Sequence, residues 1–437
     1  MKIIKTGGRE SFVDLPLKVD WILTYSCNYR CSYCFHYGEG KNPPKQLPFS
    51  TLEQLKVAVN NILSLNRPWY EVTLSGGEPT IHPHIFDLIS MLHKSLAERL
   101  RHIWIITNGS RNKSLYGRIL DIAKLVPIRM TISIHTDHVD MAHILELIES
   151  LSSYVYIRFS LMFNPAKREM VHEIYKTLHE YRKKFYFDFY FVTLRDGDHL
   201  DPRYTPNDFE WQNKATNNFN DLVKSVAPNF PARRKEKYSN PVIRDIEENG
   251  TIKTVMVGNR NIELTKGLLQ FKGKYCIAHA TVLRIEQDGR CRGMVCTDDK
   301  FICNVYEENS LRAVQDKLIH AVKCTHNICG CPANDPIPKF ASEEDAKKYV
   351  EFAQKRQAQL FEEYFSAQHI KEDSKDLPYV ISNDIIGISE SALEDYFGKA
   401  DVVRKITEYE YNNGDKKSKV IYKAENGIIT EATCSLK

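Results

Sequence analysis

No stretch of about 18 consecutive apolar residues, the length that a membrane-spanning helix needs, occurs in the 437 residues. The first ten residues, MKIIKTGGRE, contain no apolar segment of the kind found in secretory signal peptides. Positive and negative charges are nearly balanced, with 60 Lys and Arg residues and 56 Asp and Glu residues. The net charge of +4 is too small to indicate a polyanionic partner. We therefore expect a cytoplasmic protein without a membrane or nucleic-acid partner.

The overall composition is that of a soluble globular protein, with 42% hydrophobic and 27% charged residues. The length exceeds the ~250–300 residues at which single cores stop growing, so we expect one large domain with smaller additions. The predicted segments are a lead-in over 1–17, an α/β domain over 18–200, a bridging segment over 201–266, a cysteine-rich domain over 267–335, a helix within 336–372 and a small α+β appendage over 373–437. A hairpin turned at Asn426 and Gly427 is predicted to end the appendage.

Apolar runs of β type alternate with segments of helical period between Lys18 and Leu194. Strands are predicted over 19–25, 70–75, 102–107, 128–134, 154–163 and 185–194, and helices over 51–65, 83–99, 114–124, 138–152 and 167–183. Ser50 and Glu53 are expected to cap the first helix, and Pro83 to lie in the first turn of the second. The alternation predicts a parallel sheet, doubly wound or closed into a partial barrel, with the chemistry in the loops at the carboxyl ends of the strands.

Three cysteines, Cys27, Cys31 and Cys34, follow the first predicted strand without a fourth beside them. A disulfide knot is not expected, because cytoplasmic thiols are kept reduced. A zinc site would need a fourth ligand, for which His36 is the candidate. An iron-sulfur cube bound by three thiolates, with one iron left open to a substrate or cofactor, accounts better for the spacing.

The cysteine triplet resembles the motif C-x₃-C-x-φ-C of the radical S-adenosylmethionine (SAM) superfamily, with Tyr33 as the aromatic residue φ. After the second strand, Gly76, Gly77 and Glu78 match the GGE motif of that family, in which the glycine backbone approaches the methionyl amino group. The resemblance covers residues 18–194. It implies an α/β fold, a TIM-barrel-like partial (β/α)6 barrel, that holds a SAM-binding [4Fe-4S] cluster and SAM at its top.

Further cofactor contacts are implied by the resemblance at the ends of later strands. Thr107 and Asn108 follow the third strand and Ser133 ends the fourth, where such enzymes contact the ribose or carboxylate of SAM. His135 and Arg158 are weaker candidates. The favoured interpretation is that His135 is an ordinary loop residue and Arg158 an ordinary residue of the fifth strand. The reduced cluster in such enzymes gives one electron to SAM, and the resulting 5′-deoxyadenosyl radical removes a hydrogen atom from a substrate.

A second cysteine region holds Cys276, Cys291, Cys296, Cys303, Cys324, Cys329 and Cys331. Its layout is similar to the SPASM/Twitch extensions of radical SAM enzymes and implies one auxiliary [4Fe-4S] cluster. The implied ligands are Cys276 and Cys296 with two or three of Cys324, Cys329 and Cys331. Cys303 is interpreted as a buried thiol at the start of a helix, Cys291 is left undecided and Cys434 is interpreted as incidental; a zinc knot is the alternative for the region.

These features favour a radical SAM oxidoreductase or isomerase that abstracts hydrogen from a small-molecule, carbohydrate or peptide substrate. The outcome would be an oxidation, an epimerisation or a cross-link, with electrons from a donor such as flavodoxin or ferredoxin. The alternative is a zinc-stapled, non-catalytic α/β binding protein. No catalytic acid or base on the substrate side is identifiable from the sequence.

Overall fold

The computed structural model of the chain describes most of its first 223 residues and shorter segments after them. The described residues are 3–6, 17–34, 36–38, 47–196, 199–223, 242–246, 252–256, 271–277, 280, 282–293, 301–318, 321–325, 339–351, 355, 402–405, 408–413, 416–425 and 428–436. The chain divides into two compact units. The first comprises Met1–Pro228 and Tyr238–Leu360, and the second comprises Asn229–Lys237 and Phe361–Lys437.

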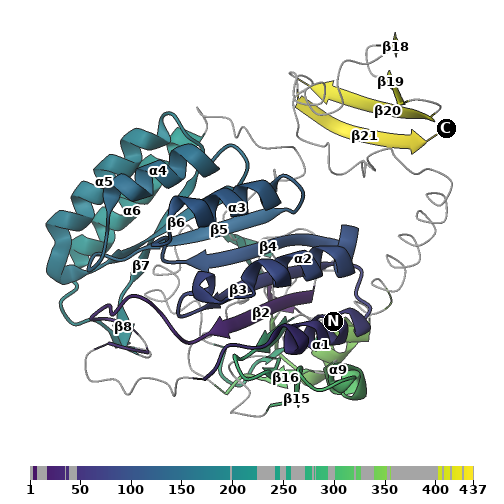
Figure 1. The fold of residues 1–437 in the computed structure, drawn as a ribbon, viewed down its shortest axis with the longest axis horizontal. Helices are drawn as coiled ribbons and strands as arrows, with labels where there is room; N and C mark the ends of the chain where they lie inside the picture. The colour runs from purple at the N-terminus through teal and green to yellow at the C-terminus, as the bar shows by residue number, and fades with distance from the viewer. Residues whose placement is uncertain are drawn as a thin grey trace. The chain divides into compact units, whose positions relative to one another are not determined.

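Six parallel strands form the larger part of a nine-stranded sheet in the first unit and run to one of its edges (Figure 1). They are β2 (Leu17–Thr24), β3 (Tyr70–Gly76), β4 (Leu100–Thr107), β5 (Ile128–Ile134), β6 (Tyr156–Phe163) and β7 (Asp188–Thr193), paired in chain order. All six correspond to the predicted strands. The α/β class and the partial barrel are therefore confirmed.

Helices connect the strands and cover one face of the sheet (Figure 1). They are α1 (Leu52–Ser64), α2 (Ile85–Leu96), α3 (Lys113–Ala123), α4 (Met141–Leu151), α5 (Arg168–Arg182) and α6 (Pro206–Val223), with short 3₁₀ turns η2 (Pro79–Ile81), η3 (Ala97–Arg99) and η4 (Pro165–Lys167). Buried side chains of alternate strand positions, such as Val72 and Ile103, pack with helix residues such as Leu55 and Leu88 into one core. This face buries the apolar surface that stabilises the fold.

Two predicted helix starts were wrong by one or two residues. The capping box of α1 uses Thr51 and Gln54, because the Thr51 hydroxyl accepts the Gln54 N–H at 3.2 Å and the Gln54 side chain accepts the Thr51 N–H at 2.9 Å. Ser50 lies instead 3.0 Å from Nε2 of the buried His82. Pro83 precedes α2, so its fixed φ shapes the approach to the helix.

Three strands from the second cysteine region extend this sheet beyond β2. β13 (Val282–Ile285) pairs in parallel with β2, and β14 (Arg290–Arg292) and β15 (Cys303–Asn304) follow in antiparallel order. No local sequence pattern predicted this junction. Part of the second region therefore belongs to the sheet that carries the first three cysteines, and the predicted boundary at residue 267 stays a prediction.

A second sheet in the same unit has six strands in the order β11-β10-β1-β17-β12-β16. The strands are β1 (Ile3–Thr6), β10 (Val242–Ile246), β11 (Ile252–Met256), β12 (Tyr275–Cys276), β16 (Val322–Lys323) and β17 (Lys339–Phe340). The unit also contains β8 (Arg195–Asp196), β9 (His199–Leu200), α9 (Ser310–Ala313) and α10 (Gln315–Leu318). The helix predicted within 336–372 is present over 343–351, and most of the remaining segment lies outside the described residues.

The second unit contains an antiparallel sheet of β18 (Val402–Lys405), β19 (Glu408–Asn413), β20 (Lys416–Glu425) and β21 (Ile428–Leu436). β20 and β21 pair as predicted, with Glu425 opposite Ile428. The predicted turn residues Asn426 and Gly427 lie outside the described residues.

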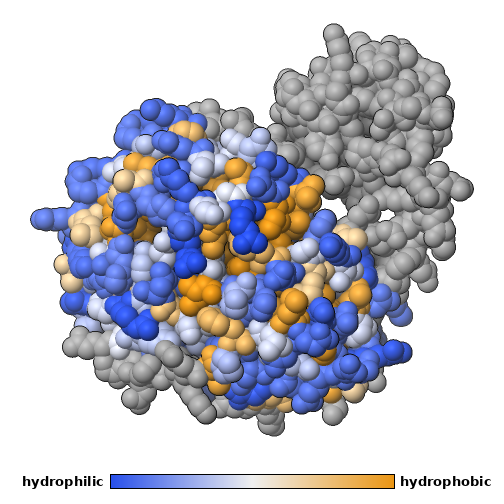
Figure 2. Space-filling model, in the orientation of Figure 1, coloured by the Kyte–Doolittle hydropathy of each residue, from blue (hydrophilic) through white to orange (hydrophobic). Residues whose placement is uncertain are grey.

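The surface of the described part is mixed in character (Figure 2). Hydrophilic side chains cover much of the face shown, and apolar ones lie in smaller areas between them. Within the described residues, no helix combines the length and apolar character needed to cross a bilayer.

Candidate functional site

The three-cysteine loop leaves the carboxyl end of β2 and turns tightly on itself. The N–H of Cys34 donates to the carbonyl of Cys31 at 3.0 Å, and the N–H of Gly38 donates to the carbonyl of Cys34 at 2.8 Å. The Cys31 side chain is buried, whereas those of Cys27 and Cys34 are half-buried. The loop thus presents three thiols at the rim of the sheet, as predicted from its position after the first strand.

The three thiols are close enough to affect one another electrostatically. Burial raises the pKa of Cys31 to about 12, and negative charge on Cys34, Asp137 and Cys27 contributes to the rise. Burial also raises the pKa of Cys27, with smaller contributions from Glu78 and Cys34. Because only thiolates bind metal, a positively charged metal group is what would stabilise three ionised sulfurs here.

The glycine loop after β3 docks directly onto the start of the three-cysteine loop. The N–H of Gly77 donates to the carbonyl of Thr24 at 2.7 Å, and the N–H of Glu78 donates to that of Ser26 at 2.9 Å. A Cβ on Gly76 would lie 2.0 Å from the Thr24 oxygen, and one on Gly77 would lie 2.2 Å from the Ser26 oxygen. Gly76 also has a φ of +133°, which side chains rarely allow. The described backbone therefore requires both glycines, and their approach to SAM stays a prediction.

Glu78 joins the glycine loop to the end of β4 through a fully buried carboxylate. One oxygen accepts the Thr80 N–H, the Thr80 hydroxyl and the Thr107 hydroxyl at 3.0, 2.6 and 2.8 Å. The other accepts the Asn108 N–H at 2.6 Å. Burial raises the pKa of Glu78, although these four donors oppose the rise. The side chain of Glu78 therefore acts as a positioning group for the rim, and so does the hydroxyl of Thr107.

The loop after β4 also contacts the three-cysteine loop. The amide nitrogen of Asn108 donates to the side-chain oxygen of Asn28 at 2.9 Å and lies 3.8 Å from the sulfur of Cys27. The Asn28 amide in turn donates to the Ser110 hydroxyl at 2.7 Å. Asn108, a predicted site residue, is thus placed beside the first cysteine.

Asp137, which the sequence did not single out, attaches the far side of the three-cysteine loop to the loop after β5. One of its oxygens accepts the N–H and the hydroxyl of Ser32 at 2.9 and 2.8 Å, and the other is 2.7 Å from the Lys167 ammonium. Hydrogen bonds from Lys167 and Ser32 hold the pKa of Asp137 below its ordinary value despite burial. Ser32 lies between the second and third cysteines, so this contact fixes their separation.

The β13–β14 turn holds the loop from the opposite side. The N–H of Tyr25 donates to the side-chain oxygen of Gln287 at 2.7 Å, and the Tyr25 hydroxyl donates to Glu286. Glu286 is itself 3.0 Å from Arg284 and 2.6 Å from Arg292. These residues, about 260 positions away in the chain, support the first residues of the loop.

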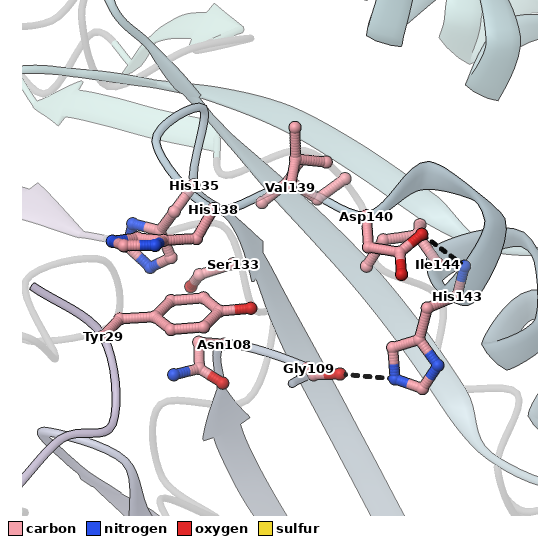
Figure 3. Close-up of a pocket in the computed structure, with 11 residues that line it drawn as sticks. Tyr29, Asn108, Gly109, Ser133, His135, His138, Val139, Asp140, His143 and Ile144 are labelled. Atoms are coloured by element: carbon pink, nitrogen blue, oxygen red, sulfur yellow. Dashed lines mark hydrogen bonds between the residues drawn. The ribbon is translucent and has the colours of Figure 1, made fainter. Parts of the chain in front are cut away.

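A small pocket, open to solvent, lies beside the loop at the ends of β4 and β5 (Figure 3). Its lining residues are Tyr29, Asn108, Gly109, Ser133, Ile134, His135, His138, Val139, Asp140, His143 and Ile144. Two predicted residues, Asn108 and Ser133, line it, as does the weaker candidate His135. Polar and aromatic groups converge there from three loops, as is usual for a small-molecule site.

Two stacked aromatic pairs lie beside the three-cysteine loop; Tyr29, His135 and His138 line the pocket, whereas Tyr33 is not a lining residue. The rings of Tyr29 and His138 stack with centroids 4.4 Å apart, and those of Tyr33 and His135 stack 6.0 Å apart. The Tyr33 hydroxyl lies 3.3 Å from Nδ1 of His135, and burial is the main cause that lowers the pKa of His135 to about 4, so this ring is neutral at pH 7. The sequence indicated Tyr33 but missed Tyr29 and His138.

The N-terminus of α4 forms the other side of the pocket. Asp140 caps the helix by accepting the His143 N–H at 3.2 Å, and Nε2 of His143 lies 2.9 Å from the Gly109 carbonyl (Figure 3). In the sequence, the only feature that could have indicated Asp140 and His143 was their position shortly after the fourth predicted strand, which is β5 in the structure.

The second cysteine region divides between the two sheets. Cys276 on β12 and Cys324, just after β16, are buried, and Cys324 donates its N–H to the Lys274 carbonyl at 2.8 Å. Because Cys276 lies opposite Val322, Cys276 and Cys324 occupy diagonal positions on the same side of the strand pair. Cys296, Cys329 and Cys331 lie outside the described residues.

Cys291 and Cys303 lie directly opposite each other in β14 and β15. Cys291 is fully buried and belongs to the core under the helices. The prediction that Cys303 opens a helix was wrong, because it lies in a strand well before α9, and its side chain is half-buried. A hydrogen bond with the Cys291 thiol lowers the pKa of Cys303.

The donor set at the rim fits a four-iron cube. Among the described residues, no three His, Cys, Asp or Glu side chains converge on a point as the ligands of a single ion do. In a cube each thiolate binds a different iron, so its cysteines stand further apart. Three thiols on one tight loop, with a pocket beside them, match a cube with one open corner and a small cofactor next to it.

The fold and the site together define a class of protein, an α/β partial barrel with a three-cysteine loop and a glycine loop at its carboxyl rim beside a pocket. Residues 21–192 match the family described as the Radical SAM superfamily. This part of the chain is a radical SAM domain.

Several curated proteins are similar to parts of the chain. Molybdenum cofactor biosynthesis protein 1 of Mus musculus is 24% identical over 240 residues, which are 49% of this chain and 32% of the relative. The probable GTP 3',8-cyclase of Thermococcus kodakarensis is 30% identical over 26% of this chain and 33% of its own length. The mycofactocin maturase MftC of Mycobacterium tuberculosis is 31% identical over 18% of this chain and 19% of its own length. The chain thus spans a third or less of these relatives.

Solved structures are also similar in part. The match to "Native anSMEcpe with bound AdoMet" covers 68% of this chain and 80% of that structure's chain, with a TM-score of 0.44 and 18% identity. The match to "Crystal structure of BtrN in complex with AdoMet and 2-DOIA" covers 70% of this chain and 87% of that structure's chain, with a TM-score of 0.34 and 10% identity.

Proposed function

We propose that this chain is a radical SAM enzyme that abstracts a hydrogen atom from a substrate bound within its partial barrel. Cys27, Cys31 and Cys34 would bind a [4Fe-4S] cluster, and SAM would occupy the adjoining pocket. When bound, the two cofactors together supply the 5′-deoxyadenosyl radical. The observation that carries the proposal is the three-thiol loop, docked on the glycine loop and open to the pocket.

The protein's own contribution is to position and enclose these cofactors. The backbone N–H of Glu78 and the side chains of Asp137 and Gln287 hold the loop in place. Tyr29 and His138 offer a flat aromatic surface of the kind on which a nucleoside base stacks. Asn108 and Ser133 supply polar groups for the remainder of the cofactor.

The second region is proposed to hold one auxiliary [4Fe-4S] cluster. Cys276 and Cys324 on one side of a strand pair support this assignment, with Cys296, Cys329 and Cys331 as the remaining candidates. A low-potential donor such as flavodoxin or ferredoxin would supply electrons. The substrate is proposed to be a small molecule, a carbohydrate or a peptide.

Anaerobic purification tests the proposal. We expect a brown protein with about eight irons, since two cubes carry four each, and SAM-dependent formation of 5′-deoxyadenosine after reduction. A colourless protein that contains zinc would favour the non-catalytic binding protein instead. An iron-loaded, reduced protein that leaves SAM intact would exclude the catalytic function.

A further inference from the structure

Two cysteines outside the three-cysteine loop form a cross-strand pair. Cys291 in β14 lies directly opposite Cys303 in β15, and the Ile302 N–H donates to the Cys291 carbonyl at 2.7 Å. Opposite residues of an antiparallel pair have Cα atoms about 4.5–5.5 Å apart and side chains on the same face of the sheet. A disulfide needs Cα atoms about 4.4–6.8 Å apart. The strand register therefore brings the two sulfurs within bonding reach.

The two thiols differ in their access to solvent. Cys291 is 0% exposed and belongs to the core, whereas Cys303 is half-buried and packs at the border of that core. A dissolved reagent therefore reaches the Cys303 sulfur first. The Cys291 sulfur is shielded by the core and faces its neighbour across the strands.

A hydrogen bond between the two thiols favours an ionised Cys303. It is the largest cause that lowers the pKa of Cys303, although burial and the Glu307 carboxylate act in the opposite direction. The same contact raises the pKa of Cys291, whose S–H is then the donor. The thiolate, not the thiol, is the form that attacks a disulfide. Cys303 is thus the nucleophile of the pair, and Cys291 is placed to react second.

The surroundings of this pair do not indicate a metal site. Thiols in hydrogen-bond contact are closer together than the ligands of one cube, each of which binds a different iron. A single ion needs further ligands, and no group of three His, Cys, Asp or Glu side chains within the described part of the chain could hold one. Cys276 and Cys324, the described candidates for the auxiliary cluster, belong to the other sheet of the unit. Cys291 and Cys303 therefore form a two-thiol site of their own.

The pair lies in strands that support the three-cysteine loop. The turn between β13 and β14 holds the Tyr25 N–H through the Gln287 side chain at 2.7 Å. Just after β15, the Val305 carbonyl accepts the side-chain amide of Asn61 on α1 at 3.0 Å. A covalent bond within the pair joins β14 to β15 between these two contacts. Neither cysteine lines the pocket, so the bond forms without occupying it.

We propose that Cys291 and Cys303 are a thiol–disulfide modification site, oxidised reversibly by a low-molecular-weight disulfide such as oxidised glutathione. The Cys303 thiolate attacks one sulfur of the reagent, forms a mixed disulfide and releases one glutathione thiolate, which takes up a proton. The Cys291 sulfur then loses its proton, attacks the Cys303 sulfur and releases the second glutathione. Two protein thiols thus give two electrons and two protons to one molecule of oxidised glutathione, which becomes two of the reduced form. This inference is independent of the proposed function.

Peptide mapping of the full-length, cofactor-reconstituted protein tests the site. The protein is equilibrated anaerobically with mixtures of reduced and oxidised glutathione, its free thiols are alkylated, and it is digested with trypsin without reduction. We expect mass spectrometry to find the peptide 301–312 joined through its cysteine to the dipeptide of Cys291 and Arg292. This linked peptide should increase with oxidised glutathione and disappear after treatment with dithiothreitol. Cys434→Ala is the matched control and should keep the linked peptide.

Two variants test the order of reaction. Cys291→Ala should accumulate glutathione on Cys303, because the second thiol is missing, and Cys303→Ser should leave the buried Cys291 unmodified. Absence of the linked peptide from the wild type at every glutathione ratio, or linkage of either cysteine to Cys296 instead, would overturn the inference. A folded Cys291→Ala protein whose Cys303 stays free of glutathione contradicts the first step. If Cys291→Ala does not fold, uptake of glutathione by Cys291 in folded Cys303→Ser contradicts the assigned order.

Discussion

The two cysteine regions are organised in opposite ways. The three-cysteine loop keeps Cys27, Cys31 and Cys34 within one turn, and four surrounding loops hold that turn in place. The second region spreads its described cysteines over two sheets, with Cys276 and Cys324 in one and Cys291 and Cys303 in the other. Closeness in the sequence therefore defines a site in the first region but not in the second.

Removing one thiol from the three-cysteine loop has the largest expected effect. Cys31→Ala should lower the iron content by about half and abolish 5′-deoxyadenosine formation, because it removes one of the only three thiolates that would hold the cube. Iron analysis and product chromatography measure both. Cys434→Ala, which changes a cysteine interpreted as incidental, should retain both properties. SAM cleavage that survives in Cys31→Ala would refute the ligand assignment.

Adding one methyl group tests whether the loop depends on the glycine loop. Gly77→Ala places a Cβ 2.2 Å from a backbone oxygen and is expected to cost about 3 kcal/mol of unfolding free energy. Gly117→Ala is the control, since a Cβ there meets nothing within 4 Å and Ala favours a helix such as α3 by about 0.5–1 kcal/mol. Urea unfolding compares the two. Wild-type stability in Gly77→Ala would contradict the docking described here.

The division of the second region can be tested with two alanine variants. Cys276→Ala should remove the auxiliary cluster and lower iron by about half, with SAM cleavage as a separate readout. Cys291→Ala should keep its iron and lose about 1–2 kcal/mol of stability, because it leaves a small cavity in the core. Iron loss in Cys291→Ala would instead place this cysteine at a cluster.

The smallest expected effect concerns the contact that holds Ser32. Asp137→Ala removes two hydrogen bonds to Ser32 and is expected to cost about 1 kcal/mol. It should also speed iron loss to a chelator from the three-cysteine loop and leave the second region unchanged. Asp87→Ala, at an exposed position beside His84 on α2, serves as the control. Equal rates in both variants would show that Asp137 does not support the loop.

Local patterns were sufficient to predict much of this fold. Alternating apolar positions predicted β2 to β7 and their helices, and the cysteine and glycine motifs predicted which strand ends meet. The parallel pairing of β13 with β2 left no local sign, because its strands are separated by most of the chain. The one-residue error at α1 arose because Ser50 and Thr51 are both good caps, and contact with His82 occupies Ser50.

The site was predictable only in part, because many of its contacts also join residues that are far apart in the sequence. Tyr29, Asp137 and His138 act through partners on other loops, so their roles appear only when the strands are assembled. Glu78 and Thr107 were identified by motif and position, yet their side chains contact each other. A motif indicates where a residue lies at a rim, and the hydrogen bonds determine what its side chain does there.

The junction between β13 and β2 has a consequence for biogenesis. While the N-terminal part of the chain emerges from the ribosome, β2 is an edge strand with unpaired backbone groups, which invite association with other chains. Tyr25 finds Gln287 only after a further 262 residues have been synthesised. A truncated chain that stops at α6 would therefore be prone to aggregate.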